Sequence, residues 1–235
     1  PVPELAIEAY QKSLLEHDDP MTKRLLKQTQ EHKTKLDAKN YLNPTLSNEA
    51  KERGNQLFQE GKWAAAIEEY SEAIKRDPTN KGALSNRAFS YTKLMQWAPA
   101  LEDCDRCIAL DPAFVKAYIR KGKIQHFLKQ YHKALDTYKA ALTIPGNENN
   151  QEIMGLLQET GMAIAQANAS GEVDEARQRE AMKDPEIQAI LRDPTMNMVL
   201  KSMQEDPVKA QAALKDADVR AKLEKLVAAG IVRMG

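Results

Sequence analysis

Cysteine is scarce in this 235-residue sequence, which contains only Cys104 and Cys107, in the stretch EDCDRC. A Cys-x-x-Cys pair can be redox-active or supply half of a zinc site, but a structural zinc site needs four ligands. The sequence has no second cysteine pair, and its four histidines show no ligand spacing near this one. We therefore expect no metal ion and no other cofactor, and we expect both cysteines to pack between helices as small apolar residues.

An excess of one charge and a long apolar run are also absent. Lys and Arg together number 34, and Asp and Glu also number 34, so the chain lacks the basic excess typical of proteins that bind nucleic acids or anionic membranes. No apolar run approaches the roughly 18 residues that span a bilayer. The N-terminus shows no signal-peptide pattern and opens on an amphipathic pattern, as if cut from a longer protein. We expect a monomeric, cytoplasmic protein that binds neither nucleic acid nor membrane.

Internal repetition is abundant. Small and aromatic residues recur with a period of 34, which is typical of tetratricopeptide (TPR) repeats, in which two antiparallel helices pack as a unit. The period predicts helix pairs at 47–60 with 63–76, 81–94 with 97–110, and 115–128 with 131–144, followed by a capping helix at about 149–168. The recurring sets are Pro78 and Pro112; Gly54, Ala88 and Gly122; Ala66, Ala100 and Ala134; and Trp63, Trp97 and Tyr131.

The flanking segments complete an all-α prediction. Ala6 and Tyr10 have the spacing of Ala66 and Tyr70, so residues 4–17 resemble the last helix of an earlier repeat. The charged stretch 21–41 has no internal Gly or Pro and predicts one long connecting helix. We expect four parts: residues 1–41, the end of a preceding TPR module with its connecting helix; 44–168, three TPR repeats and the cap; 169–173, a linker; and 174–235, a small helical domain.

Proline follows aspartate three times in the C-terminal part, at Asp184-Pro185, Asp193-Pro194 and Asp206-Pro207. Aspartate caps the first free amides of a helix and proline suits the first helical position, so each pair predicts a new short helix. Such helices are marginal alone and must pack on one another. Flexible Met side chains suit surfaces that accept varied apolar partners, although these apolar residues can equally form the core of a small domain. Five of the nine methionines lie in this part, namely Met182, Met196, Met198, Met203 and Met234.

Basic and amide side chains mark a candidate binding face on the first helix of each repeat. Lys51 and Asn55 lie four residues apart and share a helix face, as do Lys116 and Arg120, and Asn86 occupies the equivalent helix of the second repeat. First helices of successive repeats line the concave side of a TPR stack, so these groups could converge on one groove. The alternative is a solvated basic face without a ligand.

Three motifs, KERGN at 51–55, SNRAFSY at 85–91 and KAYIRKG at 116–122, resemble the carboxylate clamp of co-chaperone TPR domains. With the connecting helix and the Asp-Pro tail, nearly the whole chain is similar to the C-terminal part of the Hop (Hsp-organising protein, or stress-inducible phosphoprotein) family. The resemblance implies a non-enzymatic adaptor that binds the C-terminal Glu-Glu-Val-Asp of heat-shock protein 70, and that can also take the same motif of heat-shock protein 90. The implied clamp residues are Lys51, Asn55, Asn86, Lys116 and Arg120.

The same resemblance implies that residues 174–235 form a DP (aspartate-proline) domain that contacts client proteins through an apolar groove and supports their transfer and activation. The candidate groove residues are Leu191, Met196, Leu200, Met203 and Leu226.

Two alternatives remain open. Hip, another cofactor of heat-shock protein 70, also joins TPRs to a DP-like domain, although its Gly-Gly-Met-Pro-rich stretch is absent here. The chain could instead be the targeting region of a TPR-containing enzyme, such as a prolyl isomerase, phosphatase or ubiquitin ligase. The sequence contains no Gly-rich phosphate loop, no spaced metal ligands and no nucleophile with a placed His. We therefore expect no catalytic residues and no enzyme activity.

Overall fold

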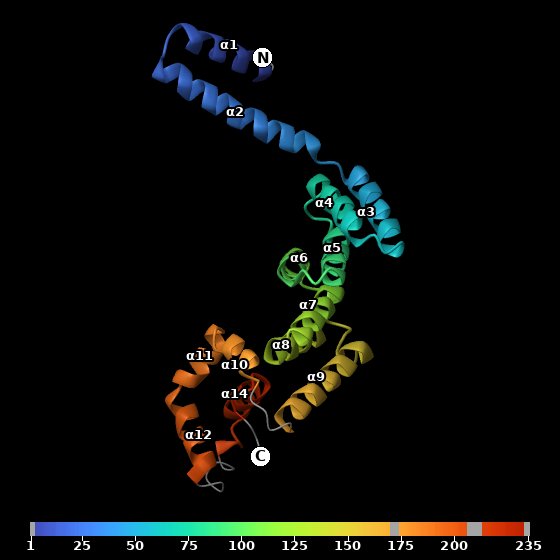
Figure 1. Ribbon diagram of the computed structural model, residues 1–235, viewed down its shortest axis with the longest axis vertical. Helices are drawn as coiled ribbons and strands as arrows, with labels where there is room; N and C mark the ends of the chain where they lie inside the picture. The colour runs from blue at the N-terminus through green and yellow to red at the C-terminus, as the bar shows by residue number, and fades with distance from the viewer. Residues whose placement is uncertain (1–2, 170–173, 206–212, 233–235) are drawn as a thin grey trace. The chain divides into compact units, whose positions relative to one another are not determined.

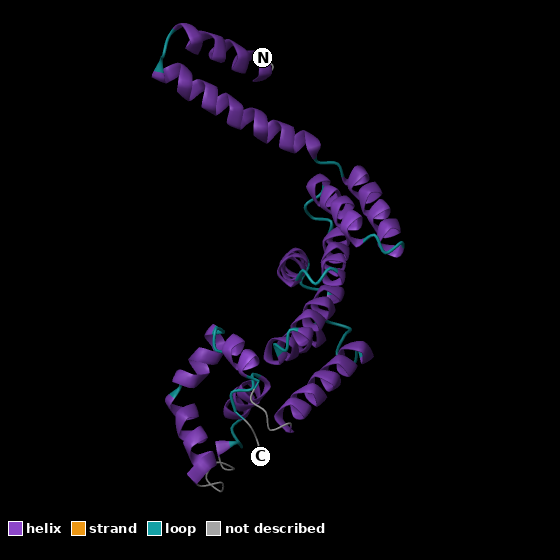
Figure 2. Ribbon diagram, in the orientation of Figure 1, coloured by secondary structure: helices purple, strands orange, loops and turns teal. Residues whose placement is uncertain are grey.

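The computed structural model describes residues 3–169, 174–205 and 213–232, and every regular element in these ranges is a helix (Figure 2). This confirms the all-α prediction. Within α5, the chain divides into two compact units, Pro1–Ser90 and Tyr91–Gly235, each with its own packing. The helices are α1 (Pro3–Glu16), α2 (Pro20–Tyr41), α3 (Pro44–Gln59), α4 (Trp63–Arg76), α5 (Lys81–Lys93), α6 (Trp97–Leu110), α7 (Val115–Phe127), α8 (Tyr131–Leu142), α9 (Gln151–Ala169), α10 (Glu175–Ala181), α11 (Pro185–Arg192), α12 (Pro194–Glu205) and α14 (Ala217–Ala228) (Figure 1).

Most repeat helices begin and end close to the predicted positions, and α6 matches its predicted range at both ends. Helix α3 begins at Pro44 instead of the predicted residue 47. The reason is a cap that the 34-residue period does not report: the Asn43 side chain accepts a hydrogen bond from the Leu46 amide at 3.0 Å, and proline takes the first helical position. Three sequence predictions lie outside the described residues: positions 170–173 of the linker, the helix start at Asp206-Pro207, and Met234.

In the first unit, α1 packs along α2 and α3 packs against α4. Helix α2 is one continuous helix of 22 residues, which confirms the long helix predicted at 21–41, and Asp19 caps it by accepting hydrogen bonds from the amides of Met21 and Thr22. The α3–α4 pair is close at Gly54, where an added Cβ would lie 2.7 Å from a ring carbon of Tyr70. A small residue at this repeat position therefore makes room for the aromatic ring.

In the second unit, α7 packs against α6 and α8, and α9 packs on both α7 and α8. The α7–α8 pair is tighter than the α3–α4 pair, because a Cβ at Gly122 would lie 2.2 Å from Cε1 of Tyr138. Tyr138 is fully buried, in a cluster that includes Ile119 of α7 and Ile153 of α9. Helix α9 thus covers the last helix pair, as the sequence predicted for a capping helix.

The C-terminal helices α10, α11, α12 and α14 surround a core of their own. Asp174, Asp184, Asp193 and Asp216 each accept a hydrogen bond from an amide in the first turn of the helix that follows. The two Asp-Pro helix starts in the described residues, at Asp184 and Asp193, are thereby confirmed. The buried core residues are Ala181, Ile187, Ile190, Met196, Val199, Val219, Leu223, Leu226 and Ala229.

Candidate functional site

The first unit brings two of the predicted clamp residues into direct contact. Asn86 Nδ2 on α5 donates a hydrogen bond to Asn55 Oδ1 on α3 at 2.8 Å. The same oxygen accepts a hydrogen bond from the Tyr70 hydroxyl of α4, also at 2.8 Å. Tyr70 is almost fully buried, so its hydrogen bond fixes the orientation of the Asn55 side-chain amide. The 34-residue period gives no sign of this hydrogen bond, through which Tyr70 positions Asn55.

Lys51 lies one helical turn before Asn55 on α3, and its side chain is half-buried. Its aliphatic stem runs beside the start of α5, because a Cβ at Gly82 would lie 3.4 Å from the Lys51 Cδ. Its ammonium group lies 3.2 Å from a carboxylate oxygen of Glu52, which is largely exposed. Because Glu52 is largely exposed, solvent screens this ion pair and makes it weak, so the ammonium can exchange Glu52 for another carboxylate at little cost.

The second unit holds the other two predicted clamp residues on one face of α7. Lys116 is exposed in the first turn, and Arg120 is half-buried one turn later. Arg120 also acts on α6: its positive charge favours the thiolate of Cys104, but burial dominates and raises the pKa of this thiol to about 12. Two cations on one face favour an anionic ligand, because like charges four residues apart repel each other.

The two cysteines are free and fully buried in α6, which confirms their expected packing role. Among residues 3–169, 174–205 and 213–232, no group of three His, Cys, Asp or Glu side chains could hold a metal ion. No helix within these ranges is long and apolar enough to cross a membrane.

The candidate groove residues of the C-terminal domain divide into two sets. Leu191, Leu200 and Met203 are half-buried and pack against the domain core, so part of each side chain reaches the surface. Met196 and Leu226 have no exposed surface and cannot line an accessible groove in this conformation. The groove prediction is wrong for these two residues, because helices this short must bury their largest apolar side chains against one another to fold at all.

The paired helices and the aspartate-capped C-terminal domain define a TPR protein with an appended DP domain. Residues 174–228 match the family described as "STI1/HOP, DP domain", and residues 54–94 and 115–148 match TPR repeat families. The chain is 43% identical to the "Hsp70-Hsp90 organizing protein" of Triticum aestivum over 233 residues, covering 98% of this chain and 40% of that protein. It is 37% identical to "Stress-induced-phosphoprotein 1" of Caenorhabditis elegans, covering 98% of this chain and 69% of that protein.

A solved structure gives the same result. The yeast Sti1 "TPR2AB-domain:pHSP90-complex" superimposes with a TM-score of 0.61 at 36% sequence identity, covering 68% of this chain and 63% of that one. The chain belongs to the Hsp70-Hsp90 organizing protein family, also named Sti1, Hop or stress-induced phosphoprotein. This confirms the resemblance on which the sequence predictions relied. The chain spans about 40% of the length of the wheat relative.

Proposed function

We propose that this chain is the part of a co-chaperone adaptor that binds the C-terminal Glu-Glu-Val-Asp tails of Hsp70 and Hsp90, and that supports client transfer between them. Its membership of the organizing protein family supports the proposal. The observation that carries it is the Asn55–Asn86 hydrogen bond with Tyr70 behind it, because an isolated solvated face has no need for two amides held in register.

The proposed chemistry assigns two roles. Lys51, Lys116 and Arg120 provide charge-assisted hydrogen bonds to the terminal α-carboxylate and the last aspartate side chain of the tail. Asn55 and Asn86 provide amide groups that fix the register of the peptide backbone.

Calorimetric titration tests this proposal. A peptide ending in Glu-Glu-Val-Asp with a free C-terminus should bind, and the same peptide with an amidated C-terminus should bind more weakly by about 1.5–3 kcal/mol, the value of a hydrogen bond to a charged group. The peptides of both chaperones should be compared side by side, because their shared last four residues offer the clamp the same groups. Equal affinity for the acid and the amide would exclude a carboxylate clamp.

We further propose that the C-terminal domain contacts clients through the exposed parts of Leu191, Leu200 and Met203. Met198 of α12 belongs with them, because it is 65% exposed, although it is not one of the groove residues predicted from the sequence. Flexible methionines suit contacts with varied apolar segments.

Leu200→Asn tests the client surface. Because Leu200 is only half-buried, the variant should fold, keep its affinity for the chaperone peptide, and lose client activation in cells that depend on this protein. Leu226→Asn is the matched comparison: it places an amide in a closed core and should unfold the domain. If Leu200→Asn folds and activates clients normally, and so do the matching changes at Leu191 and Met203, the domain has no client surface here.

The adaptor is also proposed to act as a monomer in the cytoplasm and to catalyse no reaction. The relatives it matches are named as organizing proteins and stress-induced phosphoproteins, which supports an adaptor role. Turnover by the purified chain in hydrolase, isomerase or ligase assays would contradict this part of the proposal.

A further inference from the structure

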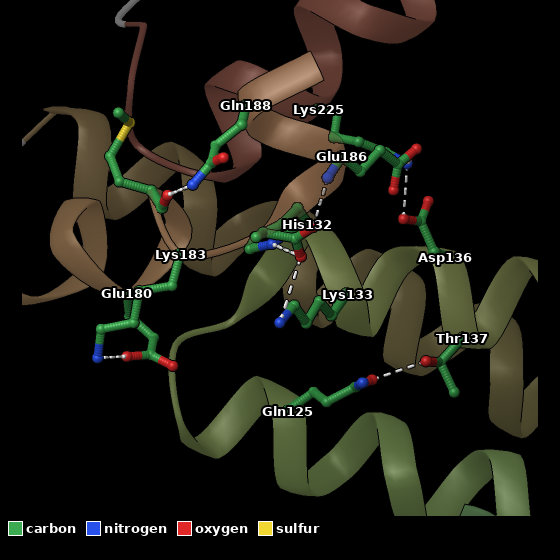
Figure 3. Close-up of polar contacts among 12 residues, drawn as sticks. Gln125, His132, Lys133, Asp136, Thr137, Glu180, Lys183, Glu186, Gln188 and Lys225 are labelled. Carbon is green, nitrogen blue, oxygen red and sulfur yellow. Dashed lines mark hydrogen bonds and ion pairs between the residues drawn. The ribbon is translucent and has the colours of Figure 1, made fainter. Parts of the chain in front are cut away.

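Three of the four capping aspartates of the C-terminal domain, Asp174, Asp184 and Asp193, divide their two carboxylate oxygens between two tasks. At Asp184, Oδ1 accepts the cap hydrogen bond from the Glu186 amide at 2.9 Å. The other oxygen, Oδ2, lies 3.2 Å from His132 Nε2 and 3.2 Å from Lys133 Nζ. Both partners belong to α8, the last helix of the third TPR repeat, and Figure 3 shows their side chains pointing toward one oxygen. One aspartate therefore starts a helix of the C-terminal domain and binds the TPR repeat.

Asp174 repeats this division. Its Oδ1 caps α10 by accepting from the Arg177 amide at 3.0 Å, and its Oδ2 accepts from Lys129 Nζ at 2.7 Å. Lys129 lies in the turn between α7 and α8, so this contact also reaches the third TPR repeat.

Asp193 shows the same chemistry directed inward. Its Oδ1 caps α12 through the Thr195 amide at 2.9 Å, and its Oδ2 accepts from Lys222 Nζ at 2.8 Å. Because Lys222 belongs to α14, this contact stays within the C-terminal domain. Asp193 is therefore a matched control for any test of the two aspartates that reach the TPR repeat.

A second ion-pair contact joins the same surfaces one helical turn further along α8. Lys225 of α14 lies 2.8 Å from Asp136 of α8 and also pairs with Glu186 of α11, and Figure 3 shows it reaching toward both carboxylates. Lys225 is mostly buried by these neighbours, with a side-chain exposure of 18%, so the pair is less screened by solvent than an ordinary surface pair.

Arg177 of α10 contacts both α14 and helix α8 of the third TPR repeat. It is buried, and its Nη2 donates to the carbonyl oxygens of Val227 and Ala228 at 3.1 and 2.6 Å. Its guanidinium also lies over the Tyr131 ring of α8, with Cζ 4.9 Å from the ring centroid. Tyr131 and Ala228 share a buried cluster with Ile164 of α9. Side chains from the TPR repeat, its capping helix and the DP domain thus share one buried cluster.

The charges at this contact are in the states that the hydrogen bonds require. Burial acts to raise the pKa of Asp184, but the Glu186 amide, Lys133 and His132 together hold this pKa below its usual value. Burial lowers the pKa of His132 and so favours the neutral ring, and a neutral ring protonated at Nε2 can donate a hydrogen bond to Asp184. Among the residues that the structure describes, the buried Nδ1 has no hydrogen-bond partner, which opposes a second proton on the ring.

We propose that the DP domain is docked on helix α8 of the third TPR repeat, held by the second carboxylate oxygens of Asp174 and Asp184 and by the Lys225–Asp136 pair. Helix α8 packs on α7, which carries Lys116 and Arg120, so docking sets the orientation of the DP domain relative to that helix. The consequence for client handling rests on the proposed function, whereas docking is tested without peptide or client.

Spin labels on cysteines introduced at two exposed positions, Lys139 of α8 and Glu224 of α14, measure the docking distance in the whole chain. The native cysteines are fully buried and should not react with the label. The unsubstituted interface should give one narrow distance peak. Asp174→Asn with Asp184→Asn should broaden it and move it to longer distance, because the asparagine oxygen still caps the helix while its NH₂ group cannot accept from Lys129 or Lys133.

Asp193→Asn is the matched control, and its distance distribution should stay narrow. Lys129→Ala with Lys133→Ala removes the partners from the TPR side, leaves every cap intact, and should broaden the peak even if the aspartate variants fail to fold. A broad distribution before any substitution would overturn the proposal, and so would a narrow peak in both the aspartate and the lysine variants. Failure of peptide binding would leave these outcomes unchanged and would bear only on the proposed function.

Discussion

Gly122→Ala is expected to destabilise the second unit by about 1–3 kcal/mol, the usual cost of overpacking a core. The new Cβ would lie 2.2 Å from Cε1 and 2.6 Å from Cζ of Tyr138. The ring cannot simply swing away, because Tyr138 is fully buried among helices α7, α8 and α9. Either the ring leaves its preferred rotamer or the two helices move apart, and both responses disturb a closely packed interior.

The measurement is the denaturation midpoint of the second unit. Trp97 of α6 reports on this unit by fluorescence in a Trp63→Phe background, which removes the only other tryptophan. Gly155→Ala on α9 is the matched control, since no atom of the described part of the chain lies within 4 Å of a Cβ built there. This control should raise stability by about 0.5–1 kcal/mol, because alanine is the better helix former. Equal effects of the two substitutions would show that the α7–α8 contact does not depend on a missing side chain.

Arg120→Ala is expected to weaken binding of the Glu-Glu-Val-Asp peptide by about 1.5–3 kcal/mol, or about 10- to 150-fold. The loss follows from the proposed charge-assisted hydrogen bond between the guanidinium and a peptide carboxylate. Arg120→Lys should fall between wild type and alanine, because lysine keeps the charge without the two-pronged geometry. Calorimetry with the free-acid peptide gives the three affinities, and the unfolding midpoint should barely change.

Lys123→Ala is the control for this experiment. It removes the same charge from the same helix, but Lys123 lies 2.8 Å from Glu152 of α9, and both partners are about half exposed. Its loss should cost the peptide affinity little beyond long-range attraction, which added salt screens. Equal losses at Arg120 and Lys123 would mean that the peptide is attracted by net charge and not held by a clamp.

The helices themselves were predictable to within a few residues, because each depends on a local pattern. The 34-residue period predicted both ends of α6. The Asp-Pro pairs at Asp184 and Asp193 predicted where α11 and α12 begin, because aspartate caps a helix and proline suits its first position. The start of α3 at Pro44 was not predicted, because the repeat period does not report a helix cap. Asparagine before proline caps a helix as well as aspartate does, and Asn43 does so here.

Tertiary contacts were not predictable in the same way. Helical periodicity marks Met196 and Leu200 alike as apolar, but only packing decides that the first is fully buried and the second is half-buried. The His132–Asp184 contact joins residues 52 positions apart, and no repeat or spacing in the sequence relates a TPR helix to an Asp-Pro segment. Asn55 and Asn86 were placed together by the repeat, whereas the Tyr70 hydroxyl bond that orients Asn55 required coordinates.

Cys104 and Cys107 of α6 are fully buried, so we expect the second unit to be insensitive to the redox state of its surroundings. Thiol oxidation and disulfide exchange proceed through the thiolate, and burial, which raises the pKa of the Cys104 thiol to about 12, leaves very little thiolate at pH 7. Cys104 should therefore react slowly with peroxide and oxidised glutathione. The closed packing around both sulfurs also keeps these oxidants out. The second unit can in this way keep its TPR packing under oxidising conditions.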